Sequence, residues 1–219
     1  MSPYRERYHR DLKELKNLAK DQANRGAEAI DKSVSALRDY NMDLAKEVIK
    51  HDQEMDDQSQ KIENLCMELL ALQQPMAKDL RRIIGILKIG IDLERIGDLA
   101  VDVARVTTQS QNKVQITKLE YIPHMAEICK KMLEGSMEAL MNSDADLARQ
   151  VTKWDYEIDG LYVKARTKIL KIIIERPEVI TEATALLLVN RHMERIGDHI
   201  CNICETIVYM VEAKREHLN

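Results

Sequence analysis

The 219-residue sequence has no phenylalanine, one tryptophan, 7 glycines and 4 prolines. Such a scarcity of helix breakers is typical of an all-α chain, and we find no alternating apolar pattern long enough to indicate a β-sheet. Glycine-rich phosphate loops, nucleophile elbows and Ser-His-Asp sets are also missing. The sequence therefore favours a helical protein without the signature of a common catalytic class.

Charge and hydropathy exclude further classes. The 33 basic and 37 acidic residues give a net charge of -4 without a basic block, so we expect no nucleic-acid ligand. Neither a run of eighteen apolar residues nor the apolar segment of a signal peptide is present, so we expect a cytoplasmic protein without direct membrane insertion. All 4 cysteines lie inside helical patterns, and we predict free thiols.

Turn-forming segments divide the chain into six long helical windows. Each window is long for a globular protein and typical of a helical bundle. The predicted helices span residues 4–38, 43–72, 77–109, 117–141, 145–174 and 179–214.

An internal repeat groups these windows into two halves. The segment "LAKEVIKHDQEMD" at 44–56 aligns with "LARQVTKWDYEID" at 147–159, and "ERIGD" at 94–98 recurs at 194–198. Each half is therefore one unit of three helices, and three amphipathic helices can close a core. We predict an all-α fold of two tandem repeated three-helix bundles, with domains at 1–112 and 113–219.

Four acidic residues occupy positions where helix packing calls for an apolar side chain: Asp52, Glu94, Asp155 and Glu194. Each is followed one helical turn later by another acid: Asp56, Asp98, Asp159 and Asp198. Like charges at this spacing destabilise a helix by about 0.2–0.5 kcal/mol in water, and burial increases the penalty. Carboxylates on facing helices suit a hard or borderline cation such as Mg, Mn, Ca or Fe, so we predict a cation site in at least one half.

Salt bridges are the alternative explanation of these acids. Arg95 is spaced to pair with Asp92 and Asp98, and Arg191 and Arg195 are spaced to pair with Glu194 and Asp198. The acids would then belong to salt-bridged faces at the rim of the bundle, which contribute little to stability.

Two other features are ambiguous. Gly97 and Gly197 follow the seam acids, which indicates either room for a bound ion or tight helix packing, because glycine inside a helix costs about 1 kcal/mol relative to alanine. Cys201 and Cys204 form a single CxxC on an apolar seam, which favours buried small residues over a zinc or redox pair.

The duplicated acidic motifs resemble the PhoU family of phosphate-transport regulators across essentially the whole chain. They are "ERIGD" at 94–98 and 194–198, "DQEMD" at 52–56 and "DYEID" at 155–159. The resemblance implies a usually dimeric cytoplasmic regulator that acts with the phosphate ABC transporter, including its ATPase, and with a sensor histidine kinase. It would suppress the phosphate-starvation response when phosphate is plentiful and restrain the transporter.

The resemblance also implies iron, zinc, manganese or magnesium ions, sometimes in multinuclear clusters. The implied ligands are Glu94, Asp98, Glu194, Asp198, Asp52, Asp56, Asp155 and Asp159. Position 102 is Asp whereas its counterpart at 202 is Asn, which puts equal metal content of the two halves in doubt.

Three functional hypotheses follow. The first is a non-enzymatic, metal-binding signalling adaptor. The second is a metal-dependent enzyme in which a carboxylate-bound ion activates water or oxygen, against which stands the lack of a positioned general base or nucleophile. The third is a helical interaction module without metal.

Overall fold

A computed structural model describes residues 3–73, 75–109 and 119–218 of the chain. These residues form helices and no strand, which confirms the all-α prediction. The first half contains α1 (Pro3–Asp39), α2 (Met42–Lys50), α3 (Asp52–Gln73) and α4 (Lys78–Gln109). The second contains α5 (Tyr121–Asn142), α6 (Ala145–Thr152), α7 (Asp155–Glu175), a 3-10 turn at Pro177–Val179 and α8 (Ile180–Glu212).

Two predicted boundaries fall at or beyond the edge of the described residues. The helix predicted from residue 117 begins at Tyr121, and residues 117 and 118 lie outside the described part of the chain. The predicted domain boundary between residues 112 and 113 also lies outside it and stays a prediction. Within the described ranges, no helix is both long and apolar enough to cross a bilayer.

The predicted continuous helices at 43–72 and 145–174 were wrong at one point each, because both are broken. The first break is at His51, whose N–H is shared between the carbonyls of Glu47 and Val48 at 3.1 and 3.2 Å. The second is at Lys153 and Trp154, whose N–H groups bond to carbonyls three residues back. Such tight turns interrupt the regular α-helical ladder. Each half therefore has three rods, the middle of which consists of two helices.

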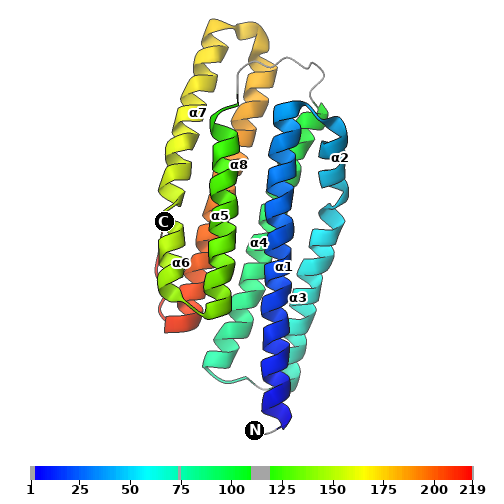
Figure 1. The fold of residues 1–219 in the computed structure, drawn as a ribbon, viewed down its shortest axis with the longest axis vertical. Helices are drawn as coiled ribbons and strands as arrows, with labels where there is room; N and C mark the ends of the chain where they lie inside the picture. Colours follow the sequence, from blue (N-terminus) through cyan, green and yellow to red (C-terminus); the bar gives the residue numbers. More distant parts are fainter. Residues whose placement is uncertain (1–2, 74, 110–118, 219) are drawn as a thin grey trace.

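The rods of each half lie side by side, and the two halves pack along their length. Figure 1 shows α1 to α4 on the right and α5 to α8 on the left, with α4 and α8 between the outer rods. Contacts between α4 and α8 and between α1 and α5 join the halves. Oδ1 of Asp92 in α4 lies 3.0 Å from Nδ1 of His199 in α8. Gly85, nearer the start of α4, faces Met210, nearer the end of α8, so these two helices are antiparallel.

A continuous hydrophobic core connects the two bundles. It includes fully buried side chains of both halves, such as Ile30, Ile89, Met132 and Ile200. A smaller cluster lies beneath α2 and consists of Ala36, Ala45, Val48, Val101 and Ala104. Burial of apolar surface is the dominant favourable contribution to folding. The larger of the two clusters contains residues of both halves, so the halves share most of this contribution.

The repeat is also visible in local hydrogen bonds. Asn41 directly precedes α2 and caps it, since its side-chain Oδ1 accepts a hydrogen bond from the Leu44 N–H at 3.0 Å. At the equivalent place in the second half, Asp144 begins α6 by accepting from the Leu147 N–H at 2.9 Å. Asn and Asp are preferred at this position because their side chains satisfy an N–H group that the helix leaves free.

Candidate metal centre

The two helix breaks position the first acid of each half. Asp52 is the first residue of α3, and Asp155 is the first residue of α7. The N-terminal end of a helix carries a partial positive charge that favours a carboxylate by about 0.3–1 kcal/mol at exposed sites. The breaks therefore turn what the sequence presents as interior helix positions into helix starts that accommodate an acid.

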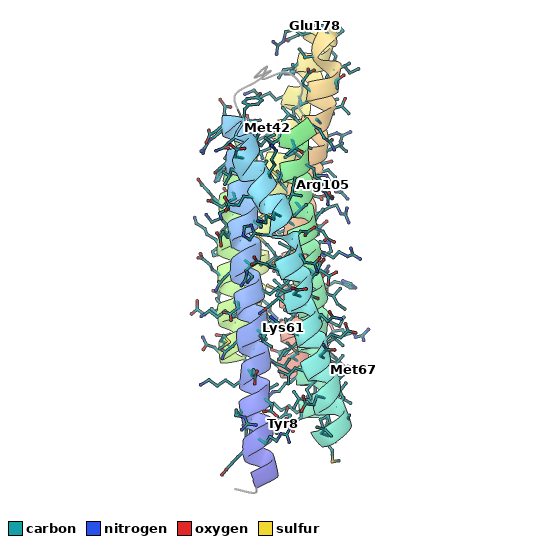
Figure 2. The ribbon with its side chains drawn as sticks, turned by 90° about the vertical axis from the view of Figure 1, so that its right-hand side faces the viewer. Tyr8, Met42, Lys61, Met67, Arg105 and Glu178 are labelled. Carbon is teal, nitrogen blue, oxygen red and sulfur yellow. The ribbon has the colours of Figure 1, made fainter. Side chains whose placement is uncertain are left out.

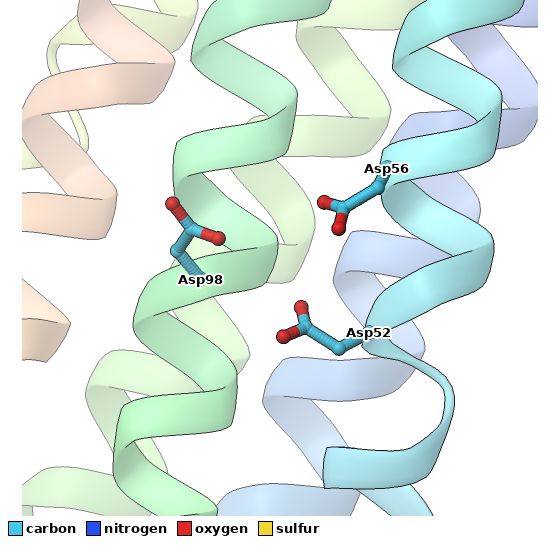
Figure 3. A group of neighbouring side chains, drawn as sticks. All are labelled: Asp52, Asp56 and Asp98. Carbon is cyan, nitrogen blue, oxygen red and sulfur yellow. The ribbon is translucent and has the colours of Figure 1, made fainter.

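Three of the predicted acids meet between α3 and α4 in the first half. Each of Asp52, Asp56 and Asp98 offers one carboxylate oxygen, and these oxygens all lie within 4.8 Å of one another. Figure 3 shows Asp52 and Asp56 pointing from α3 toward Asp98 on α4. Asp52 and Asp98 are half-buried and Asp56 is exposed, so the cluster opens to solvent on one side.

The electrostatics of this cluster favour neutralisation. Burial raises the pKa of Asp52 above its usual value, and the nearby charges of Asp56 and Asp98 raise it further. The pKa of Asp56 is raised by burial and by the charges of Glu94 and Asp98. Within the described part of the chain, neither Asp52 nor Asp56 forms an ion pair with a lysine or arginine. A bound cation would remove this repulsion.

The fourth predicted acid of the first half has a different partner. Glu94 accepts a hydrogen bond from the Ser59 hydroxyl at 2.6 Å and is not part of the group of three. Arg95 pairs with Asp98 at 2.9 Å, as the salt-bridge alternative expected, but the Arg95 side chain is 59% exposed and the half-buried Asp98 side chain 39% exposed. An exposed pair of this kind contributes little, so it does not compensate the two other acids.

The second half holds its acids deeper in the protein. Asp155 is only 2% exposed, and its buried Oδ2 atom has no hydrogen-bond partner among the residues that the structure describes. Burial, together with the charges of Asp159 and Asp198, raises the pKa of Asp155 to about 6. Glu194 also has a buried oxygen without a partner, although its other oxygen pairs with Arg191. A buried carboxylate oxygen without a hydrogen-bond partner is costly, and a bound cation would offset that cost.

The second-half acids are less tightly grouped than those of the first half. Among the described residues, only the first half brings three potential ligands within 4.8 Å of one another. The pKa of Asp159 is nevertheless raised by burial and by Asp198, and that of Glu194 by burial and by Asp198, so the four acids act on each other electrostatically. The halves thus share residue types but differ in geometry.

The two seam glycines have different roles. A β-carbon at Gly197 would collide with Oδ1 of Asp155, so this glycine lets the buried carboxylate rest against the backbone of α8. A β-carbon at Gly97 would instead meet the terminal methyl of Met55 at 2.9 Å. Room for the Asp155 carboxylate explains Gly197, and tight packing against Met55 explains Gly97.

The acids of the first half fit a hard or borderline metal ion by their geometry, and those of the second half by their residue types alone. The donors of both groups are carboxylate oxygens, which such ions prefer, and Asp155 and Glu194 each have a buried oxygen that finds no hydrogen-bond partner among the described residues. In the first half Asp52, Asp56 and Asp98 would hold the ion. The open side near Asp56 leaves room for water or for a ligand from a partner protein.

Sequence reasoning missed one contact between the halves and the partner of Asp102. His199 Nδ1 lies 3.0 Å from Asp92 Oδ1 across the α4–α8 interface, with both side chains mostly buried. Asp102 pairs with Arg105 at 2.8 Å, on an exposed surface. Histidine and aspartate on two helices of a repeat carry no pairing signal until the antiparallel alignment of α4 and α8 is known.

The cysteine prediction is confirmed. Cys201 and Cys204 are buried and free, as are the other two cysteines. The Cys201 thiol faces Asp155, and burial together with that carboxylate raises the pKa of the thiol. These thiols remain protonated, small core residues.

The fold and these sites define a class: duplicated all-α proteins with paired acidic motifs on the helices of each half. Comparison with known families agrees, since the model described as "PhoU domain" matches residues 20–107 and again residues 122–207. The chain belongs to the PhoU family.

Individual relatives match over nearly the full length. A protein of Clostridium acetobutylicum named as a phosphate-specific transport system accessory protein PhoU homolog is 33% identical, over 97% of either chain. A homolog of the same name from Aquifex aeolicus is 37% identical, over 95% of this chain and 96% of its own. The crystal structure of the phosphate transport system regulatory protein PhoU from Streptococcus pneumoniae superposes with a TM-score of 0.89 at 28% identity, covering 95% of this chain and 99% of that one.

Proposed function

We propose that this chain regulates phosphate uptake and the phosphate-starvation response as a metal-binding adaptor. Its partners would be the ATPase of a phosphate ABC transporter and a sensor histidine kinase, and it would act as a homodimer in the cytoplasm. The relatives' names, which describe accessory and regulatory proteins of phosphate transport, support this role. The observation that carries the metal-binding part is the cluster of Asp52, Asp56 and Asp98.

The position of this cluster supports an adaptor rather than an enzyme. Asp56 is exposed and the Asp98 side chain is 39% exposed, so an ion held there would face a partner protein. The relatives are named for accessory and regulatory roles and not for a reaction. An ion on an open surface would be accessible to a ligand from a second protein.

Metal binding is tested by thermal unfolding and metal analysis of chelator-treated protein before and after addition of Mn, Fe, Zn or Mg. A ligand that binds only the folded state raises the unfolding temperature by mass action, so at least one ion should stabilise the wild type. The triple variant Asp52→Asn, Asp56→Asn and Asp98→Asn should lose the part of this metal-induced rise in unfolding temperature that comes from the first half. Asp57→Asn is the matched control, because Asp57 is exposed and next to Asp56 but outside the cluster. Indifference of the wild type to all four metals would refute the metal site.

The adaptor role is tested by capture of the purified transporter ATPase and kinase on the immobilised full chain, with metal and with chelator. Retention of at least one partner, weakened by the triple variant but not by Asp57→Asn, is the expected result. Failure to retain either partner, combined with a metal-dependent turnover, would favour the alternative of a metal-dependent enzyme.

A further inference from the structure

A cavity of about 120 Å³ lies between α1, α4, α5 and α8, where the two halves meet. Its polar lining consists of Lys16, Lys78, Arg82 and Ser143, and its apolar lining of Leu140, Ile207, Met210 and Val211. Three cationic side chains therefore share one small space, and its described lining includes no acid. We call it the basic cavity. Like charges gathered in a partly buried space repel one another unless an anion joins them.

Lys16 is anchored in this cavity by three hydrogen bonds. Its Nζ donates to the carbonyls of Leu140 and Met141 at 2.7 and 3.2 Å and to the Ser143 hydroxyl oxygen at 3.3 Å. Burial lowers the pKa of Lys16, and the neighbouring charge of Arg82 lowers it further. Since Ser143 accepts from Lys16, its own O–H remains available to donate to a ligand.

Arg82 and Lys78 supply charge that is only weakly compensated. The Arg82 side chain is 25% exposed, and its ion pair with Asp79 is 3.7 Å long, beyond hydrogen-bond distance. Lys78 forms no ion pair with any acid among the described residues. It is also the first residue of α4, so the positive end of a 32-residue helix adds to the field at this point.

The repeat provides an internal comparison. Lys78 and Arg82 stand 16 and 12 residues before Glu94, and the residues at these distances before Glu194 are Glu178 and Glu182. Glu178 lies at the opposite end of the molecule from Tyr8 of α1 (Figure 2). The same structural position is thus basic at one end of the molecule and acidic at the other. Positive charge there is not required by the fold of the repeat.

We propose that the basic cavity binds a small tetrahedral oxyanion, with contacts from Arg82, Lys78 and the Ser143 hydroxyl. The chemistry is that of an inorganic phosphate ion or of the phosphoryl end of a phosphomonoester. Guanidinium and ammonium groups beside a helix N-terminus are the usual donors to such groups. Because Arg82 belongs to the first half and Ser143 to the second, the anion would join the two bundles. This site goes beyond the proposed function, since neither the acids nor a metal takes part.

Isothermal titration calorimetry of the full chain with inorganic phosphate tests the proposal. Protein and ligand are kept in chelator, so that phosphate bound through a metal at the acidic clusters does not contribute. Saturable binding with one site per chain is expected, and Lys78→Gln with Arg82→Gln should weaken it by about tenfold or more, because two charge-assisted hydrogen bonds are lost. Parallel titrations with sulfate and with glycerol 3-phosphate distinguish a free ion from a phosphomonoester.

The control is Lys46→Gln with Lys50→Gln, which removes the same charge from exposed positions on α2. It should bind phosphate as the wild type does. The proposal is overturned if the wild type shows no saturable binding, or if the two double variants weaken binding equally, since that would be a general charge effect. A triple variant lacking Asp52, Asp56 and Asp98 should still bind phosphate, so failure of the metal proposal and failure of this one give different results.

Discussion

The buried carboxylate of Asp155 rests against the backbone of Gly197, where a β-carbon would collide with its Oδ1 atom. Gly97, the counterpart in the first half, faces the flexible end of Met55 instead. One glycine thus makes room for a charge and the other for a methyl group.

Gly197→Ala should destabilise the protein by about 1–3 kcal/mol, because the new methyl group displaces Asp155 and also meets Ile158 at 3.1 Å. Gly97→Ala is the matched control: the Met55 methyl can move, and the gain in helix propensity of about 1 kcal/mol offsets the contact. Urea unfolding of both variants measures the difference. Equal losses in the two variants would contradict the distinct roles of the glycines.

The metal-free protein should become less stable as pH rises from about 4 to about 6. The folded state raises the pKa of Asp155 from 3.8 to about 6, so between these values the folded state binds more protons than the unfolded state. Stability therefore falls with increasing pH in this window, by about 2–3 kcal/mol for a shift of this size. Asp155→Asn should remove most of this slope in unfolding experiments with chelator, whereas Asp146→Asn, at an exposed position, should leave it unchanged.

The helix caps Asn41 and Asp144 should contribute equally to the stability of the protein. Asn41→Ala and Asp144→Ala should each cost about 1 kcal/mol of stability, because each leaves an N–H group of the following helix without its acceptor. Asn24→Ala, at an exposed position inside α1, is the control and should be neutral or slightly stabilising. Thermal unfolding of the three variants checks this, and a cap variant as stable as wild type would contradict it.

Asp92 and His199 should be coupled across the α4–α8 interface. A double-mutant cycle with Asp92→Ala and His199→Ala should give an interaction energy of about 0.5–2 kcal/mol, because both side chains are mostly buried. The exposed pair of Asp102 and Arg105 on α4 is the comparison, and its cycle should give about 0.2–1 kcal/mol. A larger value for the exposed pair would show that burial is not what strengthens the contact.

The sequence predicted the two bundles, because helical periodicity reports directly which residues share a face. Of the four acids predicted to line the first-half site, the structure brings Asp52, Asp56 and Asp98 together and leaves Glu94 outside that group. The sequence did not predict the breaks at His51 and at Lys153, since a single tightened turn changes the periodicity too little to be detected. It also did not predict that Ser59 would bond Glu94, because that contact depends on the rotation of one helix against another. The burial of Asp155 against Gly197 likewise requires the packed structure.

Because the hydrophobic core is continuous, the stabilities of the two acidic sites are linked. Side chains such as Ile89 and Ile200 belong to the same buried cluster, so neither half can open without exposing apolar surface of the other. We therefore expect the two sites to unfold in one cooperative step rather than independently. An ion that stabilises one half would slow hydrogen exchange in the other, and a chain cut between the halves would associate with its missing part rather than fold alone.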